Sequence, residues 1–254
     1  MCGRFVSTSP PEEIARYFGA TETADVEGRP NYNVAPTTDV WVVHADGGVR
    51  RLDPYRWGLI PTWAKDMGIG SRMINARAET VASKNAFKSS FAKRRCIVPA
   101  DGFYEWTPAP AGEKRKQPWF IHRPDHEPFA FAGLWSEWKA KDRNGEQVTV
   151  RSTTIITGEA NTKMAELHDR MPIILPPSAW DEWLDPAQTD AEALGRFLVP
   201  APPEIIQFEP VSFDVNNVRN NRPDLLEPVE VPQQPQLGDT GEVPEPEAPA
   251  ENPA

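Results

Sequence analysis

The sequence has few of the residues that build disulfide frameworks or metal sites. Its 254 residues include two cysteines, Cys2 and Cys96, and four histidines. Two cysteines so far apart form neither a C-x-x-C zinc motif nor a disulfide framework. The sequence therefore predicts no metal site and no cofactor. A chain this poor in cysteine suits a reducing, cytoplasmic compartment.

Long apolar segments are also missing. No stretch approaches the roughly 18 consecutive apolar residues that a transmembrane helix requires. The first residues lack the apolar core of a secretory signal, and Gly3 stands one position too late for myristoylation. We therefore expect a protein without membrane association.

Basic residues are absent from the end of the chain. The formal net charge is −10, but residues 227–254 hold seven acids and seven prolines and no Lys or Arg. Such a segment buries too little apolar surface to fold. The composition predicts one domain over 1–226 and a disordered acidic tail over 227–254. The nearly neutral body can still carry a local basic patch that binds anions.

Turn and cap signals divide the body into short elements. A capping box at Ser9, with proline in the first turn, predicts a helix there. Further helices are expected over 79–93 and 159–168 and after Ser178 and Thr189. Strands are expected on both sides of Asn144-Gly145 and over 39–44, 49–52, 95–99, 102–106, 118–122, 129–135 and 205–212. Many short strands with interspersed helices predict an α+β fold with a curved, barrel-like antiparallel β-sheet core and flanking helices.

Position 2 is an unusual place for a cysteine, because chain ends are usually frayed. Cys2 is either an incidental residue of a loose terminus or a nucleophile that becomes the first residue once Met1 is removed. Cys96 lies in the apolar run R-C-I-V-P, where a free cysteine behaves as a small hydrophobic residue. Position alone does not decide between the two interpretations of Cys2.

Two titratable residues stand in contexts that allow acid–base chemistry. Glu105 lies between Tyr104 and Trp106. A carboxylate buried among aromatic side chains has a raised pKa and suits proton transfer. The alternative is a solvent-facing residue of an edge strand. His168 ends a helix-like run, where it either takes part in chemistry or only complements the helix dipole.

Polar and basic residues in the middle of the chain suit an anionic ligand. Asn75 and Arg77 alternate, so on an extended segment both side chains point the same way and can hold a phosphate and a sugar oxygen. The alternative is a surface strand paired with acids. The clearest basic cluster is either a solvated helix face or a channel for single-stranded nucleic acid beside exposed tryptophans. It contains Lys84, Lys88, Lys93, Arg94 and Arg95.

Two families begin with M-C-G. The start is similar to that of the class II glutamine amidotransferases, which use an N-terminal cysteine as nucleophile. Those proteins continue with an apolar residue, whereas this chain has Arg4, and the chain's single Asn-Gly-Glu, at 144–146, lies in a polar turn. This resemblance covers few residues.

The second resemblance covers residues 2–226. The motifs C-G-R-F, Y-N-V-A-P-T, W-G-L-I-P-T-W, I-N-A-R-A-E-T, A-D-G-F-Y-E-W and H-D-R-M-P follow one another in this order. Together they resemble the SRAP family of abasic-site processing proteins, and V-N-N-V-R-N near 215–220 is similar to that family's closing segment. The resemblance implies a monomer that binds single-stranded DNA with abasic sites during the response to DNA damage. Such a protein is cytoplasmic, and nucleoid-associated when bound.

The implied chemistry gives the position of Cys2 a reason. An abasic deoxyribose opens to an aldehyde. The α-amine of an N-terminal cysteine, whose unperturbed pKa is about 8, can form a Schiff base with that aldehyde. The thiol of the same residue then closes a thiazolidine ring. An internal cysteine cannot do this. The family is also described as having thiol-peptidase-like self-processing that releases Met1, and methionine aminopeptidase is the alternative.

The resemblance also implies roles for particular side chains. Those implied in catalysis are Cys2, Asn75, Glu105 and His168. Those implied in contacting or lining the DNA site are Arg4, Pro36, Trp63, Arg77, Thr157 and Arg170, with Lys84 and Lys88 as substitutes for an arginine that Asn85 replaces. Ala64 stands where bacterial relatives often have a second tryptophan. A non-catalytic module that binds single-stranded DNA reversibly is the remaining alternative.

Overall fold

Strands are the main regular elements of the computed structural model, which describes residues 2–109, 112–141 and 145–231. The strands are β1 (Phe5–Ser7), β2 (Glu22–Thr23), β3 (Asn31–Val34), β4 (Asp39–Asp46), β5 (Val49–Trp57), β6 (Asn75–Arg77), β7 (Arg95–Ala100), β8 (Gly102–Thr107), β9 (Gln117–His122), β10 (Phe129–Lys141), β11 (Gln147–Glu159), β12 (Arg170–Pro172) and β13 (Gln207–Pro210). The α-helices are α1 (Pro11–Phe18), α2 (Lys88–Lys93), α3 (Trp180–Leu184) and α4 (Ala191–Gly195). Short 3-10 helices cover Met67–Arg72, Met164–Glu166, Pro177–Ala179, Pro203–Ile205, Phe213–Asn216 and Pro223–Leu226.

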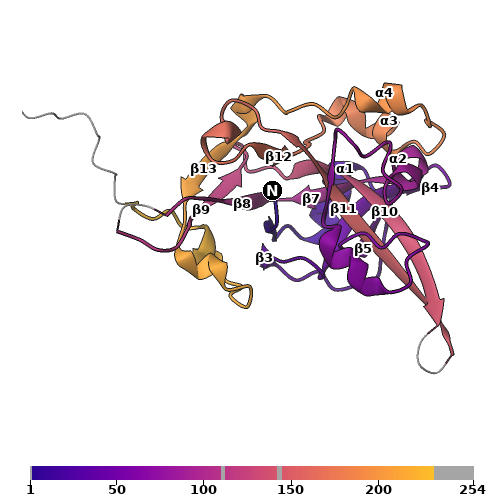
Figure 1. The fold of residues 1–254 in the computed structure, drawn as a ribbon, viewed down its shortest axis with the longest axis horizontal. Coiled ribbons are helices and arrows are strands. Elements are labelled where there is room, and N and C mark those ends of the chain that lie inside the picture. Colours follow the sequence, from indigo (N-terminus) through magenta and orange to yellow (C-terminus); the bar gives the residue numbers. More distant parts are fainter. Residues whose placement is uncertain (1, 110–111, 142–144, 232–254) are drawn as a thin grey trace, which may run out of the picture.

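Five strands close into a barrel. In order around the ring, β11 pairs with β10, then β7, β4 and β5, and β5 pairs with β11 again (Figure 1). Closure leaves none of these strands with an unpaired edge along its whole length. The predicted barrel-like core is confirmed. Four of its pairings are antiparallel as expected, but the closing pair of β5 and β11 is parallel.

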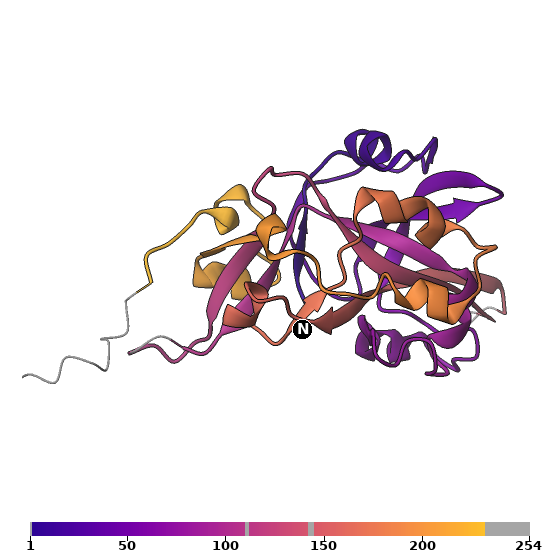
Figure 2. The same ribbon diagram turned by 90° about the horizontal axis from the view of Figure 1, so that it is seen from above.

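A second, antiparallel sheet has the order β13-β9-β8-β1-β3 and lies beside the barrel (Figures 1 and 2). Aromatic side chains join the two. The Phe5 ring of β1 contacts Trp57 of the barrel edge-on, with 5.1 Å between ring centroids, and Phe103 of β8 contacts Phe131 over 5.7 Å. The apolar core between the two sheets also contains Cys2 and Cys96, both completely buried. Cys2 and Phe5 are therefore part of the core and do not belong to a frayed end.

Helix α1 covers the other side of the barrel together with α3. Ile14 and Phe18 are buried there, and the Phe18 ring lies 4.8 Å from that of Trp180. The predicted capping box is wrong, because the N-cap residue is Pro10. The Ser9 hydroxyl instead donates to Asp101 over 2.6 Å. The Ser9 side chain, which the local pattern assigned to the helix, is instead bound by a carboxylate from the bend between β7 and β8.

Two predicted helices are mostly not helical. Of 79–93 only Lys88–Lys93 forms α2. Pairing of β6 with β11 holds the residues just before that run in the sheet, and turns follow, with Ser83 donating to the carbonyl of Thr80. Of 159–168 only Met164–Glu166 forms a 3-10 turn, because β11 continues to Glu159 and the Asn161 side chain accepts from the Met164 amide.

Smaller differences concern caps and ends. Ser178 lies inside a 3-10 turn, and the cap of α4 is Asp190 rather than Thr189. The last strand is shorter than predicted, covering Gln207–Pro210. Residues 232–254 lie outside the described residues, as does Asn144, so the disordered tail stays a prediction. Among the described residues, no helix is long and apolar enough to cross a bilayer.

Candidate active site around Cys2

Cys2 lies at the entrance to β1 and is completely buried. Strand β1 pairs with β3 and β8, and the amide of Tyr104 donates to the carbonyl of Arg4, so the chain before β1 is held against the second sheet. The Asn75 side chain donates from Nδ2 to the Cys2 carbonyl oxygen over 2.8 Å. Asn75 belongs to β6, which pairs with β11 of the barrel. Cys2 is therefore fixed between the two sheets.

Glu105 is the acid of this cluster. It belongs to β8, next to β1, and its residue surface is 3% exposed. Burial raises the pKa of the Glu105 carboxyl, and the chain's N-terminal amine and, after it, His168 act against that rise. Burial and, second, the charge of Glu105 raise the pKa of the Cys2 thiol. The predicted desolvated carboxylate is confirmed, and the exposed edge-strand alternative is wrong.

His168 lies after the 3-10 turn Met164–Glu166, where it is half-buried. Its Nδ1 is 2.9 Å from the Arg170 amide nitrogen, which donates to it, and 2.8 Å from an Asp169 carboxylate oxygen. The contact with the Arg170 amide fits a ring whose proton is on Nε2, whereas the contact with the Asp169 carboxylate fits a proton on Nδ1, so the two contacts define the orientation of the ring and not its tautomer. Backbone and side-chain contacts thus fix the ring beside Glu105.

Three neighbouring strands bring Asn75, Arg77, Thr157 and Arg170 to one place. Thr157 of β11 pairs with Arg77 of β6 and with Pro172 of β12, two residues after Arg170. Thr157 is completely buried, and its hydroxyl has no hydrogen-bond partner among the described residues. Arg77 is exposed. The sequence motifs that carry these residues are distant in the chain, and the barrel joins them.

Arg4 has partners that the sequence did not predict. Its Nη1 donates to the Asn33 side chain over 2.5 Å and to the Val215 carbonyl over 3.0 Å, and its guanidinium lies over the Trp106 ring. Burial lowers the pKa of Arg4. These contacts tie the start of the chain to the segment near 215–220. A contact of Arg4 with phosphate stays a prediction.

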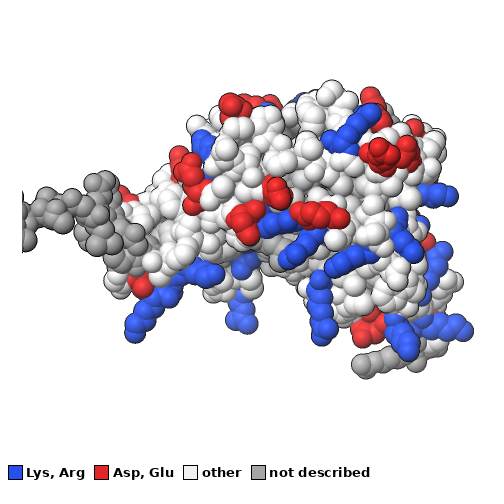
Figure 3. Space-filling view, turned by 45° about the horizontal axis from the view of Figure 1, so that its top comes forward, with Lys and Arg blue, Asp and Glu red and all other residues white. Residues whose placement is uncertain are grey.

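The other predicted DNA-binding residues lie at the surface. Trp63 is 58% exposed, Pro36 is half-buried in the turn after β3, and Lys84 and Lys88 are exposed. Lys and Arg side chains gather along the lower part of the face in Figure 3. Arg95 does not belong to this basic surface. It is 2% exposed and donates to backbone carbonyls at the ends of α2 and α3.

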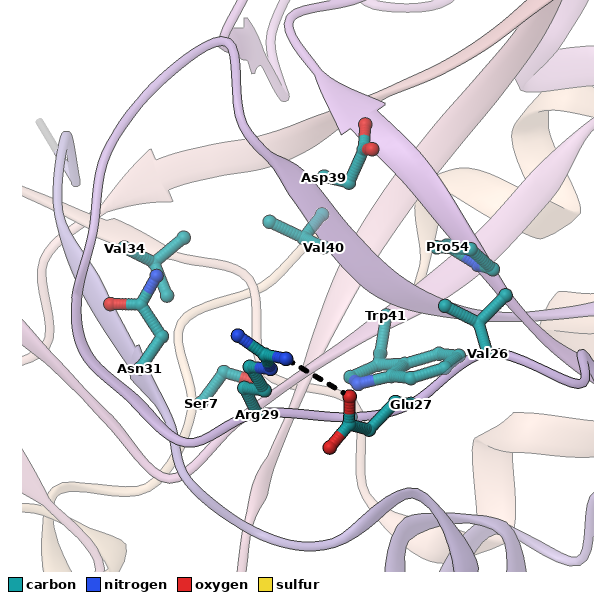
Figure 4. A pocket seen from close by; sticks show the side chains of 11 residues that line it. Ser7, Val26, Glu27, Arg29, Asn31, Val34, Asp39, Val40, Trp41 and Pro54 are labelled. Carbon is teal, nitrogen blue, oxygen red and sulfur yellow. Dashed lines mark hydrogen bonds and ion pairs between the residues drawn. The ribbon is translucent and has the colours of Figure 1, made fainter.

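A cavity of about 200 Å³ lies elsewhere, between β4, β5 and the loop before β3. Figure 4 shows Trp41 as one wall and the exposed ion pair of Arg29 and Glu27 as another. None of its lining residues belongs to the Cys2 cluster. No group of His, Cys, Asp and Glu in the described part of the chain is arranged to hold a metal ion.

The chain matches one known protein family over most of its length. The family profile described as SOS response associated peptidase (SRAP) matches residues 1–218. The chain belongs to this family. The resemblance of its six motifs is thus confirmed, and the amidotransferase alternative is not supported.

Individual relatives agree. The chain is 41% identical over 228 residues to abasic site processing protein YoqW of Bacillus subtilis, covering 89% of this chain and 99% of that one. It is 33% identical over 236 residues to abasic site processing protein YedK of Escherichia coli, covering 90% and 100%. A crystal structure of a protein from Bacteroides thetaiotaomicron has the same fold, with a TM-score of 0.77 at 24% identity over 90% of this chain and 100% of that one.

Proposed function

We propose that the chain captures abasic sites in single-stranded DNA as a covalent thiazolidine, which forms on Cys2 after Met1 has been removed. The observation that carries the proposal is the hydrogen bond from Asn75 to the Cys2 carbonyl, in a buried cluster that also contains Glu105. Relatives that are 41% and 33% identical are named abasic site processing proteins. A cysteine held in this way keeps its thiol in a fixed position. Removal of Met1 then frees an amine on the same fixed residue.

The reaction needs proton transfers at two atoms. The amine of Cys2 adds to the aldehyde of the opened sugar, and loss of one water gives the imine. The thiol then adds to the imine carbon, so that a sulfur–carbon bond forms, the π electrons of the imine move to nitrogen, and the sulfur's proton is transferred to nitrogen. Because burial raises the pKa of the thiol, it stays protonated at neutral pH and needs a base. Glu105, with its raised pKa, accepts that proton and returns it to nitrogen.

His168 and the surface cations have supporting roles. His168 assists the opening of the sugar ring: the Arg170 amide and the Asp169 carboxylate hold the ring at Nδ1, and Nε2 is the atom that exchanges a proton with the sugar. Arg77 and Arg170 contact phosphates on either side of the lesion, which guanidinium groups suit. Trp63 offers an exposed ring for stacking of a base, and Lys84 and Lys88 extend the cationic surface.

The test compares the two cysteines. The protein is incubated with a single-stranded oligonucleotide that carries one abasic site, and the products are separated under denaturing conditions. The wild type and Cys96→Ala give a stable adduct, whereas Cys2→Ala gives none. Cys96 is the matched control because it is equally buried and lies in the same apolar core. A stable adduct with Cys2→Ala would contradict the mechanism, and reversible binding without any adduct would favour the non-catalytic DNA-binding module.

The same cluster supports a second activity, the removal of Met1. The family profile is described as a peptidase, and Cys2 interacts electrostatically with Glu105, which in turn interacts with His168. If the chain processes itself, Glu105→Gln produced in cells that lack methionine aminopeptidase activity keeps Met1, whereas the wild type made in the same cells loses it. Retention of Met1 by both proteins would assign the cleavage to the cellular enzyme.

A further inference from the structure

Arg170 is already occupied by a carboxylate of the same chain. Glu79, in the turn after β6, accepts from Arg170 Nη1 over 2.5 Å and from Nη2 over 3.1 Å. Nη2 also donates to the Thr157 carbonyl over 2.7 Å. The pair is bidentate, and the Glu79 side chain is 46% exposed while that of Arg170 is 15% exposed. The guanidinium is thus fixed from inside the protein, and its carboxylate partner lies at the surface.

Glu79 keeps its negative charge in this position. The hydrogen bonds from Arg170 lower the pKa of the Glu79 carboxyl, and the charge of Arg77 lowers it further. One carboxylate therefore lies beside both of the arginines that the proposed function assigns to DNA phosphates. A carboxylate and a phosphate present two oxygens to a guanidinium in the same geometry. Glu79 consequently occupies the place that a phosphate would take.

Arg170 has a donor that Glu79 does not use. Its Nε is buried and has no hydrogen-bond partner among the described residues. The protein's own groups therefore do not satisfy the guanidinium completely. Acidic and basic side chains also lie next to one another near the centre of the face in Figure 3, so attraction of a phosphate there is opposed by neighbouring negative charge.

We propose that Glu79 is an intramolecular competitor for DNA phosphate at Arg170, and that it lowers the affinity for undamaged single strands. A phosphate can bind Arg170 only by displacing the carboxylate or by lying against its charge. Displacement of the Glu79 carboxylate weakens the binding of undamaged DNA, which gains no covalent bond in return. A strand with an abasic site is retained by the covalent bond. Glu79 would thus be a specificity-determining residue. The inference rests on the proposed function, but it concerns affinity for undamaged DNA and not the crosslink.

The experiment measures binding of an undamaged fluorescent oligothymidylate by anisotropy over a series of salt concentrations. Glu79→Gln is expected to bind about 3- to 10-fold more tightly at low salt, with a dependence of log affinity on log salt that is steeper by about 0.7, the value for one more phosphate contact on a single strand. Glu79→Asp keeps the charge and is expected to keep the weak binding.

The matched control is Glu22→Gln. Glu22 also pairs with an arginine, Arg51, on β2 and β5, so this variant removes the same charge and the same kind of ion pair elsewhere. Its affinity is expected to change less than about twofold, since exposed pairs away from the DNA contribute little. In Glu79→Gln/Arg170→Ala the gain is expected to disappear, because the phosphate then has no guanidinium to bind.

Unchanged or weaker binding by Glu79→Gln would overturn the inference. If Glu79 only held Arg170 in position, its loss would weaken the binding of DNA. An equal gain in Glu22→Gln would also overturn it, since that result would reflect net charge alone. The proposed function fails separately, if the wild type forms no adduct with abasic DNA.

Discussion

Asn75 donates from its side chain to the carbonyl oxygen of Cys2 over 2.8 Å, which joins a strand paired with the barrel to the residue that precedes the second sheet. A hydrogen bond to the backbone of the reacting residue sets where its amine and thiol lie. It does so without occupying either reactive atom. We interpret Asn75 as the residue that positions Cys2 for reaction.

Replacement of Asn75 by Ala is therefore expected to slow crosslink formation by about 10- to 100-fold, because small misplacements of reacting groups cost factors of this size. The free energy of unfolding is expected to fall by only about 1 kcal/mol, the net contribution of one such hydrogen bond. Single-turnover crosslinking and thermal melting measure the two effects. Asn85→Ala, which removes an exposed amide, is the control. Equal rates of crosslink formation for Asn75→Ala and Asn85→Ala would contradict the positioning role of Asn75.

The pH dependence of crosslinking tests Glu105. If Glu105 accepts the thiol proton, the rate rises as pH increases through the pKa of this carboxyl, which burial has raised above its ordinary value of 4.5. Glu105→Gln is expected to lose this limb and to slow the reaction by about 100- to 10,000-fold. Glu12→Gln, on the exposed side of α1, keeps the wild-type profile. The same limb in Glu105→Gln would assign the titration to another group.

Gly58 holds the turn between β5 and the segment that carries Trp63. Its φ is +124°, and a Cβ there would lie 2.6 Å from the carbonyl oxygen of Gly70. Gly58→Ala is therefore expected to lower the free energy of unfolding by roughly 2–4 kcal/mol, from backbone strain and the close contact together. Gly47, at φ +58°, lies in the left-handed region that other residues also enter, and a Cβ there would have no atom within 4 Å, so Gly47→Ala is expected to cost only about 1 kcal/mol. Urea denaturation compares the two, and an equal loss would mean that the contact adds nothing.

Arg95 stabilises the helices from inside the protein. It donates to the carbonyls of Phe91 and Ala92 at the end of α2, and to those of Trp183 and Asp185 at the end of α3. Arg95→Met removes all four of these hydrogen bonds, and only the Asp185 carbonyl keeps another donor, the Gln188 amide, among the described residues.

Arg95→Met is expected to lower the free energy of unfolding by about 3 kcal/mol, which corresponds to a fall in Tm of roughly 6–12 °C for a chain of this size. Arg94→Met removes a neighbouring guanidinium whose side chain donates to Ser89 alone among the described residues, and its Tm is expected to change by less than about 2 °C. Differential scanning calorimetry measures both. Similar melting temperatures for the two variants would show that the buried donors contribute little.

Much of the strand pattern could be predicted from the sequence, because alternating apolar residues and turn signals are local. The hairpin of β4 and β5 and the one around Gly145 are where these signals put them. The helix expected over 79–93 was wrong for a nonlocal reason. Its composition favours a helix, but pairing with β11 fixes Asn75–Arg77 as a strand and leaves turns behind it. Ser9 shows the same effect, since the acceptor that binds it comes from Asp101.

The candidate site was predictable only in part. The aromatic context of Glu105 indicated a buried carboxylate, and burial at 3% exposure agrees. The motif I-N-A-R-A-E-T contains Glu79 next to Arg77, but nothing in it indicates that Glu79 binds Arg170, which is 91 residues away. The sequence around Asn33 likewise does not indicate that its side chain contacts Arg4. Nor does it indicate the contacts of Asn33 with the carbonyls of Val215, Asn217 and Asn220. Such partners depend on how the two sheets meet.

The most direct test of the central claim is the intact mass of the adduct with an abasic-site oligonucleotide, measured before and after treatment with borohydride. The expected mass is the sum of the masses of protein and DNA, less one methionine residue and one water molecule. No hydrogen is expected to be added by borohydride, because a thiazolidine has no imine to reduce. An adduct that retains Met1, or one that gains two hydrogens as a Schiff base would, contradicts the thiazolidine on Cys2.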